Sequence, residues 1–278
     1  MPNESAWSVI AEPASNALVL GVDFPAAGRH EAGFEDLVAG MGADWSGLGV
    51  LQTSPPPVRL ADRPTGDSYT EHWMHAGDWE KYEVKAVLGY CVGSVYAGKV
   101  AERLAEIHGR MPQILLFDAQ LADLQLLESE MHKMIGQAGP VLTAEEAEQG
   151  RKQAGEIVAA PSIKMADAAG QMVDLYRGMA SSAFRRIGLS ESRCEEMVLL
   201  FESYMTWLAA SSEVDPGKAW EGAIGFTSAD YAELEKTGAT TVVNATATIG
   251  RRIPIDIGHA DLLRDGATVR ALLAHAEF

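Results

Sequence analysis

The sequence predicts an α/β protein whose mostly parallel sheet has helices on both faces and is interrupted by an all-helical insertion. Short apolar runs alternate with helical patterns in both the N-terminal and the C-terminal parts of the chain, an alternation that is typical of parallel sheets. Between these parts, residues 143–212 contain no strand pattern. We therefore expect three segments: residues 1–139 as the first part of the α/β core, residues 140–215 as a helical lid, and residues 216–278 as the second part of the core.

The first part contains four expected strands, each a short aliphatic run bounded by glycine, proline or polar residues. Helical periodicity fills most of the gaps between them. The triple proline at 55–57 cannot pair inside a sheet, so it marks a surface loop. The expected strands are 16–22, 47–53, 86–90 and 114–117, and the expected helices are 35–41, 69–85, 99–107 and 124–134.

The insertion begins at a capping box formed by Thr143 and Glu146. Methionines then recur every seven residues at Met165, Met172 and Met179. This stripe has two interpretations: ordinary packing between helices, or an adaptable apolar surface for a long acyl chain. After the insertion, the expected strands are 223–227, 240–243 and 253–257, followed by a C-terminal helix at 268–275.

Composition restricts the classes of partner. The 278 residues carry 22 basic and 39 acidic side chains, a formal charge of 22 − 39 = −17, so nucleic acid and anionic membrane surfaces are poor partners. Two cysteines, Cys91 and Cys194, do not make a disulfide framework. The N-terminus lacks a secretory signal pattern, and no apolar run is long enough to span a bilayer. We therefore expect a soluble, cytoplasmic protein.

One of the apolar runs ends in Gly89-Tyr90-Cys91-Val92-Gly93 and passes directly into a helical pattern. This is the outline of the G-x-S-x-G nucleophile elbow, with cysteine in the place of serine. Flanking glycines suit such a turn, because a side chain at either position would collide with the adjoining strand or helix. The helix N-terminus favours a thiolate. The motif predicts Cys91 as a nucleophile; the alternative is a buried cysteine in a glycine-rich turn.

A cysteine nucleophile needs a base, and the base needs a carboxylate that orients it. Among the seven histidines, His259 follows a late expected strand through a glycine, where the chain order nucleophile–acid–base places the base. Two aspartates are candidates for the acid. Asp118 ends the strand after the elbow helix, and Asp230 follows the strand at 223–227. Spacing alone leaves both open.

Several motifs together resemble a polyketide or nonribosomal-peptide thioesterase domain, which has an α/β-hydrolase fold: Gly-Tyr-Cys-Val-Gly-Ser at 89–94, Leu-Leu-Phe-Asp at 115–118, the helical insertion, and Gly-His-Ala-Asp-Leu-Leu at 258–263. In that family the acid follows the strand after the nucleophile helix, which implies Asp118 rather than Asp230. With cysteine in place of serine, the chain is similar to the Dieckmann cyclases, thioesterase-like enzymes that release tetramic acids and pyridones from hybrid assembly lines.

The resemblance implies a triad of Cys91, Asp118 and His259, with backbone N–H groups of Val92 and Ala27 as the oxyanion hole. It also implies a hydrophobic acyl substrate on the phosphopantetheine arm of an acyl or peptidyl carrier protein, with no cofactor or metal. Cysteine itself favours carbon–carbon closure, because a thioester is a better electrophile for an enolate than an oxyester. Two alternatives are a stand-alone thioesterase that hydrolyses acyl carriers and a non-catalytic partner that binds them.

Overall fold

In the computed structural model of the chain, residues 2, 5–25, 30–45, 47–56, 58–237 and 248–277 are described. Contacts within the chain divide it into two units. The core unit comprises Met1–Pro56, Gly66–Leu121 and Val214–Phe278, and the helical unit comprises Pro57–Thr65 and Ala122–Glu213. These units differ from the expected segments, because residues 57–65 and 122–139 cluster with the helices.

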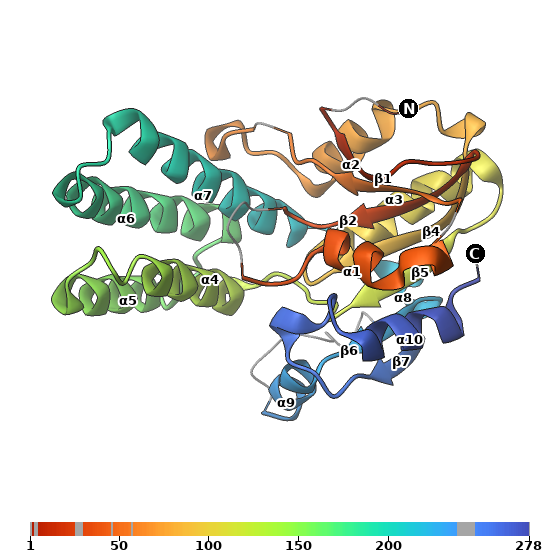
Figure 1. The fold of residues 1–278 in the computed structure, drawn as a ribbon. Coiled ribbons are helices and arrows are strands. Elements are labelled where there is room, and N and C mark those ends of the chain that lie inside the picture. Colours follow the sequence, from red (N-terminus) through yellow and green to blue (C-terminus); the bar gives the residue numbers. More distant parts are fainter. Residues whose placement is uncertain are drawn as a thin grey trace. The chain divides into compact units, whose positions relative to one another are not determined.

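The described part of the core unit is built on a seven-stranded sheet with the order β1-β3-β2-β4-β5-β6-β7 (Figure 1). β1 is antiparallel to β3, and the other neighbouring pairs are parallel. The carboxyl ends of the parallel strands therefore meet at one edge of the sheet, where ligands bind in open α/β sheets. The strands are β1(Trp7–Ala11), β2(Ala17–Val22), β3(Gly49–Thr53), β4(Glu83–Tyr90), β5(Gln113–Phe117), β6(Ile224–Thr227) and β7(Arg251–Pro254).

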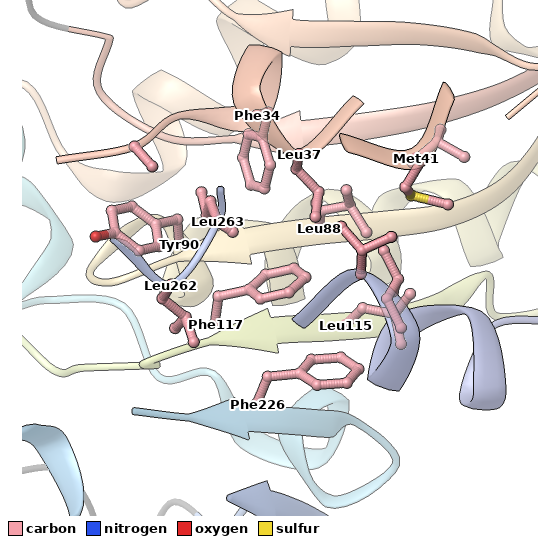
Figure 2. Close-up of a cluster of buried hydrophobic side chains, with 14 of the residues drawn as sticks. Phe34, Leu37, Met41, Leu88, Tyr90, Leu115, Phe117, Phe226, Leu262 and Leu263 are labelled. Atoms are coloured by element: carbon pink, nitrogen blue, oxygen red, sulfur yellow. The ribbon is translucent and has the colours of Figure 1, made fainter. Parts of the chain in front are cut away.

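Helices cover both faces of this sheet. On one face, Phe34 of α1 and Leu272 of α10 join a buried cluster with alternating strand residues such as Leu88 and Phe117 (Figure 2). The Phe117 and Phe226 rings stack in this cluster with centroids 5.0 Å apart. On the other face, α3 packs against β2, β4 and β5, and α2 and α8 pack against α3. The predicted α/β-hydrolase architecture, a mostly parallel sheet with helices on both faces, is confirmed.

The helices of the core unit and its short 3₁₀ turns connect the strands in the order expected for βαβ units. They are α1(Phe34–Met41), α2(Gly66–His75), α3(Gly93–His108), α8(Gly217–Glu221), α9(Ala229–Thr237) and α10(Gly266–His275), with the 3₁₀ turns η1(Gly42–Trp45), η3(Trp79–Lys81) and η4(His259–Asp261).

The helical unit contains α4(Leu124–Gln137), α5(Ala144–Val158), α6(Met165–Arg186) and α7(Glu191–Ser211), together with the 3₁₀ turn η2(Leu60–Asp62). The predicted capping box at the start of α5 is present: Glu146 N–H donates to Thr143 Oγ1, and Thr143 N–H donates to a Glu146 carboxylate oxygen. Met172 is fully buried. The methyl group of Met179 lies where a side chain on Gly150 of α5 would sit. Packing between helices therefore accounts for these two methionines.

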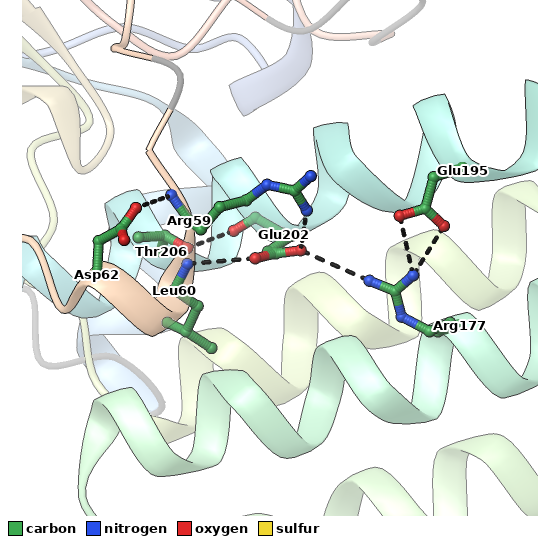
Figure 3. A network of polar contacts seen from close by, with 7 residues as sticks. All are labelled: Arg59, Leu60, Asp62, Arg177, Glu195, Glu202 and Thr206. Atoms are coloured by element: carbon green, nitrogen blue, oxygen red, sulfur yellow. Dashed lines mark hydrogen bonds and ion pairs between the residues drawn. The ribbon is translucent and has the colours of Figure 1, made fainter. Parts of the chain in front are cut away.

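A buried carboxylate holds η2 against α7 within the helical unit (Figure 3). Glu202 on α7 accepts hydrogen bonds from Arg59 Nη1 and from the Leu60 N–H, each at 3.2 Å. The Arg177 guanidinium lies 3.6 Å from the same carboxylate and also pairs with Glu195. This network explains why the short segment before α2 belongs to the helical unit.

Three expectations differ from the observed elements. β1 lies in a stretch for which no strand was expected. The helix expected at 69–85 is wrong in extent, since α2 ends at His75 and the chain enters β4 at Glu83. The strand expected at 253–257 is observed as β7 at Arg251–Pro254. The strand expected at 240–243 lies outside the described residues. Among the described helices, none is long and apolar enough to cross a membrane.

Candidate active site

Cys91 occupies a strained turn between β4 and α3. Its φ of 50° lies in the left-handed region, which non-glycine residues rarely adopt. Neighbouring backbone holds the turn in place: the Cys91 N–H donates to the Phe117 carbonyl at 2.9 Å, and the Cys91 carbonyl accepts from the Ser94 N–H at 3.1 Å. Strain that is maintained in this way is a feature of functional sites. The predicted elbow conformation is therefore present.

The two flanking glycines are required by close packing. A Cβ on Gly93 would lie 2.2 Å from the Val22 carbonyl oxygen at the end of β2. A Cβ on Gly89 would lie 2.5 Å from Ser94 Cα and 2.9 Å from Ala97 Cβ, both on α3. Real Cβ atoms do not approach backbone this closely, so only glycine fits at either position. The two glycines of the G-x-C-x-G motif thus allow α3 to pack closely against β2 and β4.

Cys91 is half-buried and precedes α3 directly. Val92 is the N-cap residue of this helix and has helical dihedral angles. The helix N-terminus places the positive end of the macrodipole next to the thiol, which favours the thiolate. Cys91 Sγ lies 3.5 Å from Gln120 Oε1, and the Gln120 N–H donates to the Cys91 carbonyl at 3.3 Å. Ala27, the other expected oxyanion residue, lies outside the described residues.

Asp118 follows β5 directly, in a second left-handed conformation with φ of 45°. Its carboxylate is buried, with the residue 1% exposed. One oxygen, Oδ1, accepts from the Ser228 N–H at 2.7 Å, and the other, Oδ2, lies 2.7 Å from His259 Nδ1. Both oxygens are therefore engaged, and the carboxylate is held by the loop after β6 while it orients the imidazole.

His259 opens η4, just after β7. Its backbone N–H donates to Asp230 Oδ2 at 2.7 Å, while its ring nitrogen Nδ1 faces Asp118. The structure thus distinguishes the two candidate acids: Asp118 meets the imidazole ring, and Asp230 meets the backbone of the same residue. An ionised carboxylate at Nδ1 leaves Nε2 as the nitrogen that can exchange a proton, as in nucleophile–base–acid arrangements. The catalytic roles of these residues stay predictions.

Sequence reasoning missed two groups that contact the expected triad. The Tyr90 hydroxyl lies 3.0 Å from His259 Nε2, and the Tyr90 and His259 rings stack with centroids 5.0 Å apart. Gln120 contacts Cys91 as described above. Tyr90 occupies the variable position before the nucleophile in the elbow motif, which was its only signal in the sequence.

In the described part of the chain, no three His, Cys, Asp or Glu side chains are grouped so that they could hold a metal ion.

These features define the protein by fold and site: an α/β-hydrolase fold with a cysteine in the elbow after β4 and a paired aspartate and histidine after β5 and β7 of the same sheet. Contacts join Cys91 Sγ to Gln120 and His259 Nε2 to the Tyr90 hydroxyl. No protein-family model matches the sequence, and no curated protein matches it.

Solved structures do resemble this chain. The Vlm2 thioesterase domain, bound with a dodecadepsipeptide, is 15% identical, with 98% of each chain covered and a TM-score of 0.52. The NocB thioesterase domain, in a covalent complex with a nocardicin G analogue, is 15% identical over 96% of this chain and 97% of its own, with a TM-score of 0.46. An enol-lactonase from Burkholderia xenovorans LB400 is 12% identical over 96% and 94%, with a TM-score of 0.45. At this identity, the likeness to the Vlm2 thioesterase domain shows the fold alone.

Proposed function

We propose that this protein is a cysteine-dependent Dieckmann cyclase, which releases a carrier-bound β-ketoacyl-aminoacyl thioester as a tetramic acid or pyridone. The observation that carries the proposal is a cysteine, not a serine, in the strained elbow at the sheet edge where Asp118 and His259 pair. Such a site forms covalent acyl intermediates, because the thiolate is a strong nucleophile and the oriented imidazole handles its proton.

Thioester chemistry favours cyclisation over hydrolysis at this site. Exchange of a carrier thioester onto Cys91 converts one thioester into another and is nearly isoenergetic. The acyl group on sulfur is then a good electrophile for an enolate, and the thiolate is a good leaving group. A hydrolase has to admit water to the acyl-enzyme, whereas a cyclase has to exclude it and admit a carbon nucleophile.

The proposed reaction begins with acyl transfer. His259, oriented by Asp118, takes the proton of the Cys91 thiol. The thiolate attacks the carbonyl carbon of the carrier thioester, so that a bond to Sγ forms and the bond to the pantetheine sulfur breaks. The departing pantetheine thiolate takes the proton from His259. Backbone N–H groups of Val92 and Ala27 would hold the oxyanion of the tetrahedral intermediate.

Ring closure completes the proposed reaction. His259 takes the acidic proton from the carbon that lies between the ketone and the amide carbonyl of the β-ketoamide. This carbon attacks the thioester carbonyl, which forms the new carbon–carbon bond and breaks the bond to Sγ. The Cys91 thiolate takes the proton back from His259, and a five-membered tetramic acid leaves. The acidity comes mainly from the substrate, so the protein contributes positioning and the exclusion of water.

The proposed partner is an acyl or peptidyl carrier protein, and the proposed substrate carries a hydrophobic acyl chain on its phosphopantetheine arm. No cofactor is needed, because every step is a proton or acyl transfer. The Vlm2 thioesterase domain has a similar fold, which supports the processing of acyl thioesters at a general level.

The test is an incubation with an N-acetoacetyl-aminoacyl thioester of pantetheine, followed by mass spectrometry of the products and of the intact protein. We expect a tetramic acid and an acyl adduct on Cys91. Cys91→Ala should abolish both. The matched control is Cys194→Ala, which removes the other free cysteine and should change neither.

Two outcomes would contradict the proposal. A linear free acid as the sole product would identify a hydrolytic thioesterase that uses the same residues. Carrier binding that survives Cys91→Ala, with no acyl adduct on the wild-type protein, would identify a non-catalytic partner of acyl carriers.

A further inference from the structure

The ring of Tyr90 stacks with the imidazole of the proposed base. Tyr90 is the last residue of β4 and only 3% exposed, and it belongs to the buried cluster on the α1 face of the sheet (Figure 2). Its ring is nearly parallel to that of His259, at an interplanar angle of 10°. A residue this buried can act on the reaction through its contacts with His259.

The phenol oxygen of Tyr90 lies within hydrogen-bond distance of two atoms of His259. It lies 3.0 Å from Nε2 of the His259 ring and 3.1 Å from the His259 carbonyl oxygen. The carbonyl can only accept, whereas Nε2 accepts in the neutral ring and donates in the imidazolium. At the other ring nitrogen, Asp118 Oδ2 is 2.7 Å away. An ionised carboxylate only accepts, so Nδ1 carries a hydrogen in both forms of the ring.

The single hydrogen of the Tyr90 hydroxyl therefore has two satisfactory positions. When His259 is neutral, the hydroxyl donates to Nε2. When His259 is an imidazolium, the hydroxyl turns to donate to the His259 carbonyl, and its oxygen accepts from Nε2–H. Only a hydrogen moves between these arrangements, because the same heavy-atom positions serve both.

We propose that Tyr90 is a positioning residue that hydrogen-bonds His259 in both protonation states and stabilises the imidazolium more, because the imidazolium makes two hydrogen bonds with the hydroxyl and the neutral ring makes one. A stabilised imidazolium favours the thiolate form of Cys91, whose proton His259 takes in the proposed function. The inference rests on the proposed function in taking Cys91 as the nucleophile and His259 as its base. In the proposed reaction the imidazole gains and loses a proton in both the acyl-transfer and the ring-closing stage. Because only the O–H bond of Tyr90 has to rotate, the surroundings of His259 need no rearrangement of heavy atoms at Tyr90 when the imidazole gains or loses a proton.

Other polar groups around His259 have different tasks. Asp118 faces Nδ1, and Asp230 accepts from the backbone N–H. Asp261, on the same turn, pairs with Arg264 at 3.5 Å. Cys91 follows Tyr90 directly in the chain. Among these contacts, the Tyr90 hydroxyl is the one that hydrogen-bonds His259 Nε2 and therefore changes with its protonation.

The test measures the reactivity of the Cys91 thiolate in the full-length protein without any acyl substrate. Alkylation of Cys91 by iodoacetamide is followed by intact mass as a function of pH, in a Cys194→Ala background so that one thiol reacts. Tyr90→Phe keeps the stacked ring and removes only the hydroxyl. Because a hydrogen bond to a charged group is lost, we expect the rate at neutral pH to fall about tenfold and the rate profile to move about one pH unit higher.

Controls separate this effect from damage to the fold. Tyr82→Phe, at another tyrosine of the core unit, should leave the alkylation profile unchanged. If Tyr90→Phe does not fold, 3-fluorotyrosine at position 90 keeps the hydroxyl but makes it a weaker acceptor, and the profile should move in the same direction by less. An unchanged profile in the folded variant would overturn the inference.

Failure of this inference is distinguishable from failure of the proposed function. Alkylation needs no carrier thioester, so a Tyr90 effect would stand even if the wild-type protein released only a linear acid. Conversely, the wild-type protein could form the tetramic acid while Tyr90→Phe leaves the alkylation profile of Cys91 unchanged. That result would leave the cyclase proposal intact and would exclude the role of Tyr90.

Discussion

The carboxylate of Asp118 and the imidazole of His259 meet at 2.7 Å although they lie 141 positions apart in the chain. The sheet order explains the meeting, because β5, which ends just before Asp118, is separated from β7 only by β6. The segment after β6 contributes to both residues: Ser228 N–H donates to the second oxygen of Asp118, and Asp230, in the first turn of α9, accepts from the backbone N–H of His259. One short segment therefore holds both the acid and the base.

This geometry predicts different consequences for the two candidate acids. Asp118→Asn keeps the shape of the side chain but removes the charge that orients the imidazole, so we expect the turnover number to fall roughly 10³- to 10⁴-fold. Asp230→Asn retains a carbonyl oxygen for the His259 N–H, and we expect less than about a tenfold loss. The measurement is the rate of thiol release from a pantetheine thioester. Equal losses in the two variants would show that Asp118 is not the orienting acid.

The elbow glycines make a prediction about stability. Gly93→Ala would place a methyl group 2.2 Å from the Val22 carbonyl oxygen. We expect this substitution to lower the free energy of unfolding by about 3 kcal/mol or more, since neither strand nor helix can give way cheaply. The measurement is urea denaturation followed by circular dichroism.

Gly178→Ala is the matched control for the elbow variant. Gly178 lies inside α6, and a Cβ there would meet no atom within 4 Å. Alanine is the better helix former, so we expect a gain of about 0.5–1 kcal/mol. Similar stability for the two variants would contradict the packing described for the elbow.

Sequence patterns predicted those parts of the fold and site that depend on local chemistry. The elbow from Gly89 to Gly93 was predictable because a sharp turn from a strand into a helix leaves no space for a side chain at these two positions. The Thr143 capping box was predictable because its two hydrogen bonds join residues three apart. The β1 strand was not predicted, because it is a short edge strand in which Ser8 interrupts the apolar run.

Relationships across the sheet could not be predicted from spacing. Asp118 and Asp230 both follow strands that end at the same edge, so either could face His259. Which one meets the ring and which one meets the backbone depends on the course of the loops after β5 and β6. The support from Tyr90 likewise depends on how the residues after β7 lie over β4, and no local pattern encodes that placement.

The buried carboxylate in the helical unit leads to a second stability prediction. Glu202→Ala removes the acceptor for Arg59 and for the Leu60 N–H from an environment in which the Glu202 side chain is 11% exposed (Figure 3). We expect a loss of about 2 kcal/mol, because hydrogen bonds to a buried charge are among the stronger ones. Thermal denaturation followed by circular dichroism at helical wavelengths measures it.

Glu195→Ala provides the comparison, because Glu195 pairs with the same Arg177 but its side chain is 49% exposed. Exposed ion pairs contribute little, so we expect a loss below about 1 kcal/mol. If Glu195→Ala cost as much as Glu202→Ala, the contribution of Glu202 would not come from its burial.

A last prediction concerns the aromatic cluster of Tyr69, Trp73 and Tyr96. The Tyr69 hydroxyl is fully buried and has no hydrogen-bond partner among the described residues, and burial raises the pKa of this phenol. Tyr69→Phe removes a desolvated polar atom and keeps the ring, so we expect a gain of about 1 kcal/mol in the free energy of unfolding. Tyr231→Phe should have the opposite effect, because the Tyr231 hydroxyl donates to the Ala119 carbonyl. Urea denaturation of both variants tests the pair, and a loss of stability in Tyr69→Phe would reveal a partner for its hydroxyl.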